Sequence, residues 1–116
     1  MYVDGFVVPV PKKNIGAYTE LSKKMSKLWK DEGALSYVEC VADDVKSGEV
    51  TSFPQSVKLK DDEVVVFSWI TYNSKEDRDR INKKVMEAPE MKEMGKDMPF
   101  DGKRMFMGGF KTILEA

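Results

Sequence analysis

The chain has 116 residues, of which 41% are apolar and 34% are charged, so it can form one domain with an apolar core and a charged surface. Nineteen basic and twenty acidic side chains leave a net charge of −1, which argues against a protein that binds nucleic acid or an anionic membrane through a basic surface. No histidine is present, which excludes Ser-His-Asp and Cys-His nucleophile systems, imidazole metal sites and a histidine-ligated haem.

The first predicted element is a strand over residues 2–10, which is rich in valine and which we expect Pro9 and Pro11 to stop. A helix is predicted next, over residues 13–30, because apolar residues recur there at spacings of three and four. Gly33 is expected to end this helix. The apolar stripe consists of Ile15, Tyr18, Leu21, Met25, Leu28 and Trp29.

Two strands follow this helix. Residues 34–43 alternate in the way that suits a strand, and residues 63–73 form the densest apolar run of the chain. The connection over residues 43–63 is long for a hairpin, so we expect it to hold an extra strand around residues 50–53 or to form an arm.

A second helix is predicted from Ser74 to about residue 88, because Ser74 with Asp77 three residues later is a plausible N-cap pair. Pro89 should mark its boundary or begin a short turn. The last strand is predicted over residues 104–114. Two glycines in the middle of that strand, at 108 and 109, indicate a bulge or a close backbone approach.

The order strand, helix, strand, strand, helix, strand predicts an α+β fold of the ferredoxin-like βαββαβ type. We expect a single domain over residues 1–116, with an antiparallel four-stranded sheet and helices on one face. In the strand over 63–73 both alternating sets of side chains are apolar, so both faces should be covered, although two helices can cover only one. We therefore expect a homodimer that packs sheet against sheet; the rival account is that the 43–63 connection folds back over its own sheet.

Four separated motifs resemble the YbaA-like family, a bacterial family of unknown function, and the resemblance covers essentially the whole chain. It implies a dimeric α+β barrel, a superfamily that includes cofactor-independent monooxygenases, haem-degrading enzymes, lactone isomerases and small stress-response proteins. The family brings no established catalytic residues with it. The motifs are residues 2–11, residues 33–37 with 39–41, residues 51–54 and residues 98–105.

Four residues are candidates for ligand binding, and no catalytic residue can be named. Trp69 and Tyr37 could line a pocket between the sheet and the helices, although ordinary packing is the alternative for Trp69. Asp101 and Arg104 lie around a predicted turn, where Arg104 could hold an anionic group as a forked donor. The alternative for that pair is a turn with a surface ion pair.

Two acids, Asp4 and Glu39, lie within strand patterns, and either could act as a base if it points inward. The lone Cys40 is expected to be a small buried side chain, and it cannot form an internal disulfide. The paired acids elsewhere lack a recognised metal-binding spacing, so we expect neither a metal nor a cofactor.

Taken together, these patterns favour a cytoplasmic protein without signal peptide or membrane span. The leading hypothesis is a protein that binds a small apolar or aromatic molecule, either simply as a ligand or as the substrate of a cofactor-independent oxygenase or isomerase. The alternative is a regulatory or stress-response dimer that binds a protein partner. RNA binding would need a basic face built from the lysines at 12, 13, 23, 24, 27 and 30, which suit a solvated helix face better.

Overall fold

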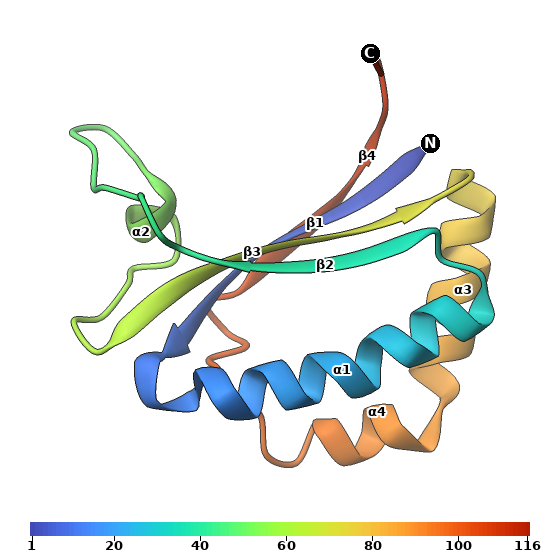
Figure 1. The fold of residues 1–116 in the computed structure, drawn as a ribbon, viewed down its shortest axis with the longest axis horizontal. Coiled ribbons are helices and arrows are strands. Elements are labelled where there is room, and N and C mark those ends of the chain that lie inside the picture. The colour runs from blue at the N-terminus through green and yellow to red at the C-terminus, as the bar shows by residue number, and fades with distance from the viewer.

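The computed structural model describes residues 1–116 and contains a four-stranded antiparallel sheet with its long helices on one face (Figure 1). The strands lie side by side in the order β2-β3-β1-β4, which confirms the predicted ferredoxin-like α+β fold. The strands are β1 (Tyr2–Pro11), β2 (Ser36–Val41), β3 (Glu63–Tyr72) and β4 (Phe106–Lys111). The helices are η1 (Lys12–Asn14), α1 (Ile15–Glu32), α2 (Phe53–Ser56), α3 (Lys75–Glu87) and α4 (Pro89–Met94).

The helix boundaries follow the capping residues of the sequence. Gly33 adopts a left-handed conformation with φ of 117°, and its N–H donates to the carbonyl of Lys30, so it ends α1 as predicted. Ser74 precedes α3, and its Oγ accepts a hydrogen bond from the backbone N–H of Asp77 at 3.1 Å, which confirms the predicted N-cap. Pro89 starts α4, a separate short helix.

Pro9 does not stop the first strand, contrary to the prediction. β1 continues to Pro11, and Pro9 lies opposite Val65 of β3. The other neighbour, β4, pairs only with residues 2–7 of β1, so on that side β1 has no partner strand at Pro9. A residue without an N–H is tolerated at such a place because no ladder hydrogen bond is lost.

The face of the sheet that meets the helices carries the main core. Met25 and Trp29 of α1 pack with Ile81 of α3 and with Ile70 and Tyr72 of β3. None of these side chains is more than 8% exposed. The two long helices are therefore held to the same side of the sheet by one continuous apolar cluster. None of the helices combines the length and the apolar character that crossing a bilayer requires.

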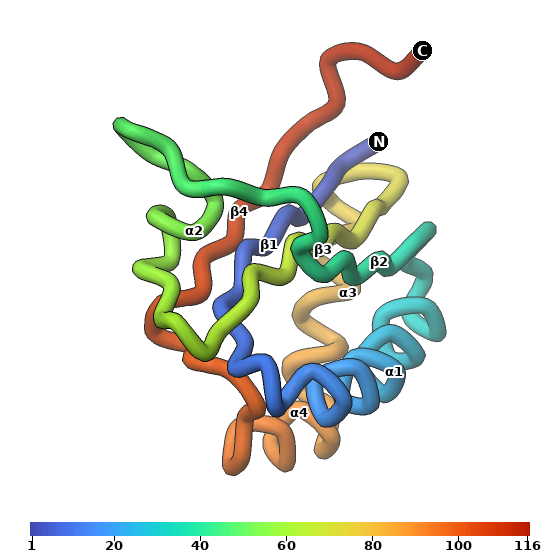
Figure 2. The backbone as a smooth tube through the Cα atoms, turned by 60° about the vertical axis from the view of Figure 1, so that its left-hand side comes forward, coloured from blue at the N-terminus to red at the C-terminus, as the bar shows by residue number.

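The connection between β2 and β3 lies on the opposite face of the sheet, over one end of it (Figures 1 and 2). It contains the short helix α2 and no strand near residues 50–53, because Ser52 caps a helical turn there. Val57, only 1% exposed, packs against Val7 and Val65. At this end of the sheet the chain covers its own second face, as the rival account of the apolar strands proposed.

The rest of the second face is open. Phe67 of β3 is 42% exposed and Phe106 and Phe110 of β4 are 46% and 65% exposed. Cys40 also faces this side, on the edge strand β2, and it is exposed rather than buried as predicted.

The two glycines of β4 form no bulge, because the pairing with β1 runs without interruption from Phe106 to Lys111. Gly109 is instead the site of a close approach. A Cβ atom there would lie 2.5 Å from Oη of Tyr2 and 2.7 Å from Nη2 of Arg78. The guanidinium of Arg78 lies over the ring of Tyr2, 5.0 Å from its centre, so only glycine leaves room beneath this pair.

Candidate functional site

A cavity of about 190 Å³ lies between the sheet and the helices α1, α3 and α4. Sixteen of its twenty lining residues are hydrophobic. Met86 and Met107 are 57% and 48% exposed, so the cavity opens to solvent where they lie, on α3 and β4. The lining includes six methionines, at 25, 86, 91, 94, 105 and 107, and the aromatic residues Phe6, Tyr18, Trp29, Tyr37 and Phe100.

Two simple periodicities direct side chains into this cavity. On α1, Tyr18, Ser22, Met25 and Trp29 follow each other at spacings of four, three and four, so they share one face of the helix. On β2 alternate residues point to the same side of the sheet, so the carboxyl group of Glu39 lies beside the Tyr37 ring.

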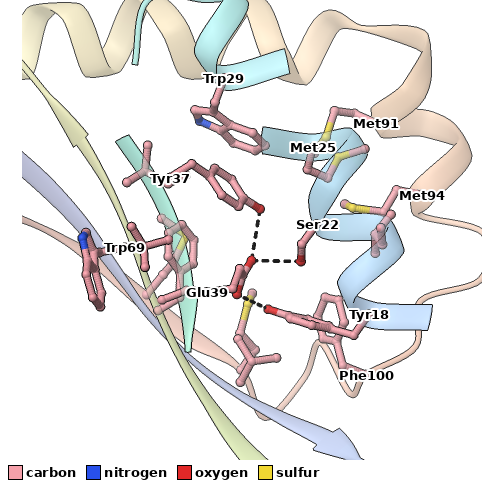
Figure 3. A pocket seen from close by; sticks show the side chains of 18 of the residues that line it. Tyr18, Ser22, Met25, Trp29, Tyr37, Glu39, Trp69, Met91, Met94 and Phe100 are labelled. Carbon is pink, nitrogen blue, oxygen red and sulfur yellow. Dashed lines mark hydrogen bonds between the residues drawn. The ribbon is translucent and has the colours of Figure 1, made fainter. Parts of the chain in front are cut away.

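Glu39 is the polar centre of the cavity, and three hydroxyl groups surround its carboxylate (Figure 3). The hydroxyl of Tyr18 donates to Oε1 at 2.8 Å. The hydroxyls of Ser22 and Tyr37 both donate to Oε2, each at 3.1 Å. Burial, and then the charge of Glu39, raise the pKa values of Tyr18 and Tyr37 well above their ordinary range. Both phenols are therefore neutral hydrogen-bond donors at any physiological pH.

No positive charge balances this carboxylate. Glu39 takes part in none of the eight ion pairs of the structure. Every other lining residue is apolar or carries a neutral polar group, so Glu39 is the single charged residue of the cavity wall. The arrangement can receive a hydrogen-bond donor or a proton from a bound molecule.

Asn82 is a second polar group of the cavity lining. It accepts a hydrogen bond from Nε1 of Trp29 at 2.9 Å. Its Nδ2 donates to Oδ2 of Asp4 at 3.3 Å, and the Tyr72 hydroxyl donates to the same oxygen at 3.0 Å. Asp4 is completely buried, and its Oδ1 has no hydrogen-bond partner, with Nη1 of Arg78 3.8 Å away. Both acids singled out in the sequence thus point toward the helices.

The two aromatic candidates of the sequence differ in their placement. Tyr37 lines the cavity as expected. Trp69 borders the cavity from β3, but its ring lies on the other face of the sheet, 5.7 Å from the ring of Phe67, and points away from the cavity (Figure 3). Its indole therefore belongs to the open face, and Trp29 supplies the indole of the cavity.

Arg104 and Asp101 lie outside the cavity. Nη1 and Nη2 of Arg104 bind the two carboxylate oxygens of Glu63 at 2.8 and 2.5 Å, and Nε binds Oδ2 of Asp101 at 2.7 Å. Nη1 also donates to the carbonyls of Val57 and Lys58. Arg104 is a forked donor, as predicted, but its partners are groups of the chain itself. Arg104 and Asp101 therefore form a structural ion pair at a turn, which was the alternative to anion binding for these two residues.

Sequence reasoning missed Tyr18, Ser22 and the methionines as parts of the site. Tyr18 and Ser22 are one helical turn apart on the stripe of α1, so the spacing of a polar residue within that stripe was an available signal. Six of the eight methionines of the chain surround an open volume. No spacing in the sequence distinguishes a methionine that fills a core from one that lines a cavity.

Comparison with known proteins places this architecture in a family. The model of the family "Protein of unknown function (DUF1428)" matches residues 1–102. The uncharacterized protein YbaA of Escherichia coli K12 is 55% identical over 114 residues, which are 98% of this chain and 97% of the relative, and YbaA of Shigella flexneri matches equally well. The resemblance noted in the sequence is thereby confirmed.

Two solved structures share the fold. Protein Atu4242 from Agrobacterium tumefaciens superposes with a TM-score of 0.56 at 14% identity, over 96% of this chain and 92% of that one. The de novo designed protein Foldit4 gives a TM-score of 0.50 at 14% identity, over 96% and 97% of the two chains. At such low identity these likenesses show the fold alone.

Proposed function

The chain belongs to the DUF1428 family of proteins of unknown function, and from the geometry of its cavity we propose that it binds a small apolar or aromatic molecule between its sheet and its helices. The observation that carries this proposal is an open apolar volume where a domain of this size would normally be close-packed. An engineered cavity of about 150 Å³ is enough to hold benzene. A volume of about 190 Å³ therefore suits one aromatic ring with a few further atoms.

The polar groups of the cavity support a ligand site rather than a packing defect. Glu39 with its three hydroxyl donors and Asn82 are among the few polar groups of a lining that is otherwise mostly apolar. A few converging polar groups in an apolar cleft are the usual composition of a small-molecule site. If the bound molecule undergoes a reaction that begins with loss of a proton, Glu39 is the base that the cavity offers.

The test is a titration of isotope-labelled protein with toluene, followed by the two indole N–H resonances. Trp29 lines the cavity and Trp69 turns its ring to the other face, so the Trp29 resonance should shift and the Trp69 resonance should not. Met94→Trp narrows the cavity and should abolish the shift. Met98→Trp, at a methionine outside the lining, should leave it intact. An unchanged Trp29 resonance up to the solubility limit of toluene would contradict the proposal.

We also propose that the chain forms a homodimer through the open part of the second sheet face. The paired glycines Gly5 and Gly108 leave a trough there of about 580 Å³, flanked by the partly exposed rings of Phe67, Phe106 and Phe110. In a two-fold dimer the phenylalanine rings of one copy can fill the trough of the other, because both copies present the same surface to the axis.

Two projecting segments support the same assembly. The C-terminal end of the chain and the connection that carries α2 both extend on the side of the sheet away from α1 and α4 (Figure 1). Each carries almost fully exposed apolar side chains, Val50 at 94% and Ile113 at 93%. A partner seated on the open face would meet both segments, which would remove this apolar surface from water.

Sedimentation at micromolar concentration tests the dimer. The unaltered chain should have twice the mass of one chain, and Phe110→Glu should have the mass of one. Leu35→Glu, a control at a 44% exposed apolar residue outside the trough, should remain dimeric. A single-chain mass for the unaltered protein contradicts the homodimer and favours the alternative function, a module whose open face binds a different protein.

A further inference from the structure

We propose that the molecule bound in the cavity is a small hydrophobic cation: an aromatic or alkyl group bearing a protonated amine that contacts Glu39. This inference rests on the proposed function, because it names the chemical class of the ligand for that same cavity. It follows from the charge, the free hydrogen-bonding capacity and the aromatic surroundings of one side chain.

The charge of the cavity is the first argument. Glu39 is only partly exposed, and its three contacts are neutral hydroxyl groups rather than cations. The buried guanidinium groups of the chain are bound elsewhere: Arg104 pairs with Glu63 and Asp101, and Arg78 lies beside Asp4. A partly desolvated carboxylate gains most from a partner of opposite charge, because an apolar medium strengthens the attraction between the two. The chain supplies no such partner, and a ligand can.

The free acceptor capacity of the carboxylate is the second argument. An ionised carboxylate offers about four lone-pair positions on its two oxygens. The hydroxyls of Ser22 and Tyr37 occupy Oε2, whereas Oε1 receives only the hydroxyl of Tyr18. One position on Oε1 is therefore open to a further donor. An ammonium N–H fits it, because it brings a charge-assisted hydrogen bond and needs no acceptor in return.

The surroundings of Glu39 are the third argument. Two of its hydroxyl donors belong to aromatic pairs: the Tyr37 ring lies 5.8 Å from the ring of Trp29, and the Tyr18 ring lies 5.7 Å from that of Phe100. The negative face of an aromatic ring attracts a cation and repels an anion. The methionine side chains around the rest of the cavity suit the apolar part of the same molecule.

Three ligands of nearly equal size but different charge separate this inference from the proposed function. Benzylamine is protonated at pH 7, benzyl alcohol is neutral and benzoate is an anion. Binding is followed by the Trp29 indole N–H resonance, as in the toluene titration. We expect benzylamine to bind about 10- to 100-fold more tightly than benzyl alcohol, the range for a hydrogen bond to a charged group, and benzoate to bind least.

Two variants assign the preference to Glu39. Glu39→Gln keeps the size of the side chain and removes its charge, so benzylamine and benzyl alcohol should then bind equally. Glu20→Gln, the control, makes the same substitution at an exposed residue of α1 outside the cavity lining, so the preference for benzylamine should persist. If Glu39→Gln fails to fold, the comparison of the three ligands on the unaltered chain still decides.

The failures of the two proposals are distinguishable. Equal binding of benzylamine and benzyl alcohol to the unaltered chain would overturn the cation inference while leaving the apolar site in place. A preference for the amine that survives Glu39→Gln would overturn it as well. If neither toluene nor any of the three ligands binds, the proposed function itself is wrong.

Discussion

Removing the hydroxyl of Tyr72 should destabilise the fold strongly, because this hydroxyl makes the shorter of the two hydrogen bonds to the completely buried carboxylate of Asp4. In Tyr72→Phe, Oδ2 of Asp4 keeps only the longer bond from Asn82, and Oδ1 is already without a partner. A hydrogen bond to a charged group contributes about 1.5–3 kcal/mol, and a buried acceptor left unsatisfied adds to that loss. We expect a loss of about 2–3 kcal/mol in the free energy of unfolding, or roughly 10 °C in Tm for a chain of this size.

Urea denaturation followed by circular dichroism measures this loss, and the chain offers a matched control. Tyr37→Phe also removes one phenol hydroxyl from a carboxylate, but Glu39 retains two other donors and is partly exposed. Its cost should be below about 1 kcal/mol. In an Asp4→Asn background the cost of Tyr72→Phe should shrink, because the two side chains are coupled. Equal losses of stability in the two tyrosine variants would show that the burial of Asp4 does not make its hydrogen bond more valuable than that of Glu39.

Three further predictions concern other parts of the structure. Arg104 holds the pKa of Glu63 below its ordinary value of 4.5, so this carboxylate stabilises the fold above that pH and its contribution is lost as pH falls through the lowered pKa. In urea titrations from pH 7 to 3, Glu63→Gln should therefore be less stable than the unaltered chain at pH 7, and its free energy of unfolding should fall less steeply with pH. A parallel fall in the two proteins would contradict this. Gly109→Ala should lower Tm, because the added Cβ would lie 2.5 Å from the hydroxyl oxygen of Tyr2. Gly16→Ala is the control: it has open space around it on α1, so it should raise the free energy of unfolding by about 0.5–1 kcal/mol and raise Tm. Equal effects of the two substitutions on Tm would disprove the close approach at Gly109. Val57→Ala should lower the free energy of unfolding by about 2 kcal/mol in urea denaturation, because it removes the side chain that packs the 43–63 connection against Val7 and Val65 of the sheet. An unchanged free energy of unfolding would show that this packing does not stabilise the fold.

The fold was predictable from the sequence because its signals are local. The apolar stripe of α1, the left-handed Gly33 and the Ser74 cap each depend on residues within a few positions of one another. Pro9 was misjudged because its effect depends on how far a distant strand, β4, extends beside β1. The connection over 43–63 was ambiguous for a similar reason: the contact of Val57 with Val7 joins residues far apart in the chain.

The site was only partly predictable. In β3 both alternating sets of side chains are apolar, so the sequence could not show which set meets the helices. Trp69 borders the cavity, but its ring lies near that of Phe67 on the other face. In the sequence Arg104 has the features of an anion-binding residue. In the structure its guanidinium is already bound to the carboxylate of Glu63, which lies 41 positions away in the chain. Glu39 was identified as a strand acid that could point inward, but its hydroxyl donors on α1 became evident only once the helix lay against the sheet.

The methionine lining has a consequence for the selectivity of the cavity. A methionine side chain bends at three bonds and has a polarizable sulfur, so six of them can rearrange around differently shaped molecules at little cost. A rigid wall of branched side chains would bind a ligand with one additional methyl group more weakly, whereas the methionine side chains can move to make room for it. Discrimination between ligands would then come from the carboxylate of Glu39, and a series of amines with different hydrocarbon groups would bind with similar affinity.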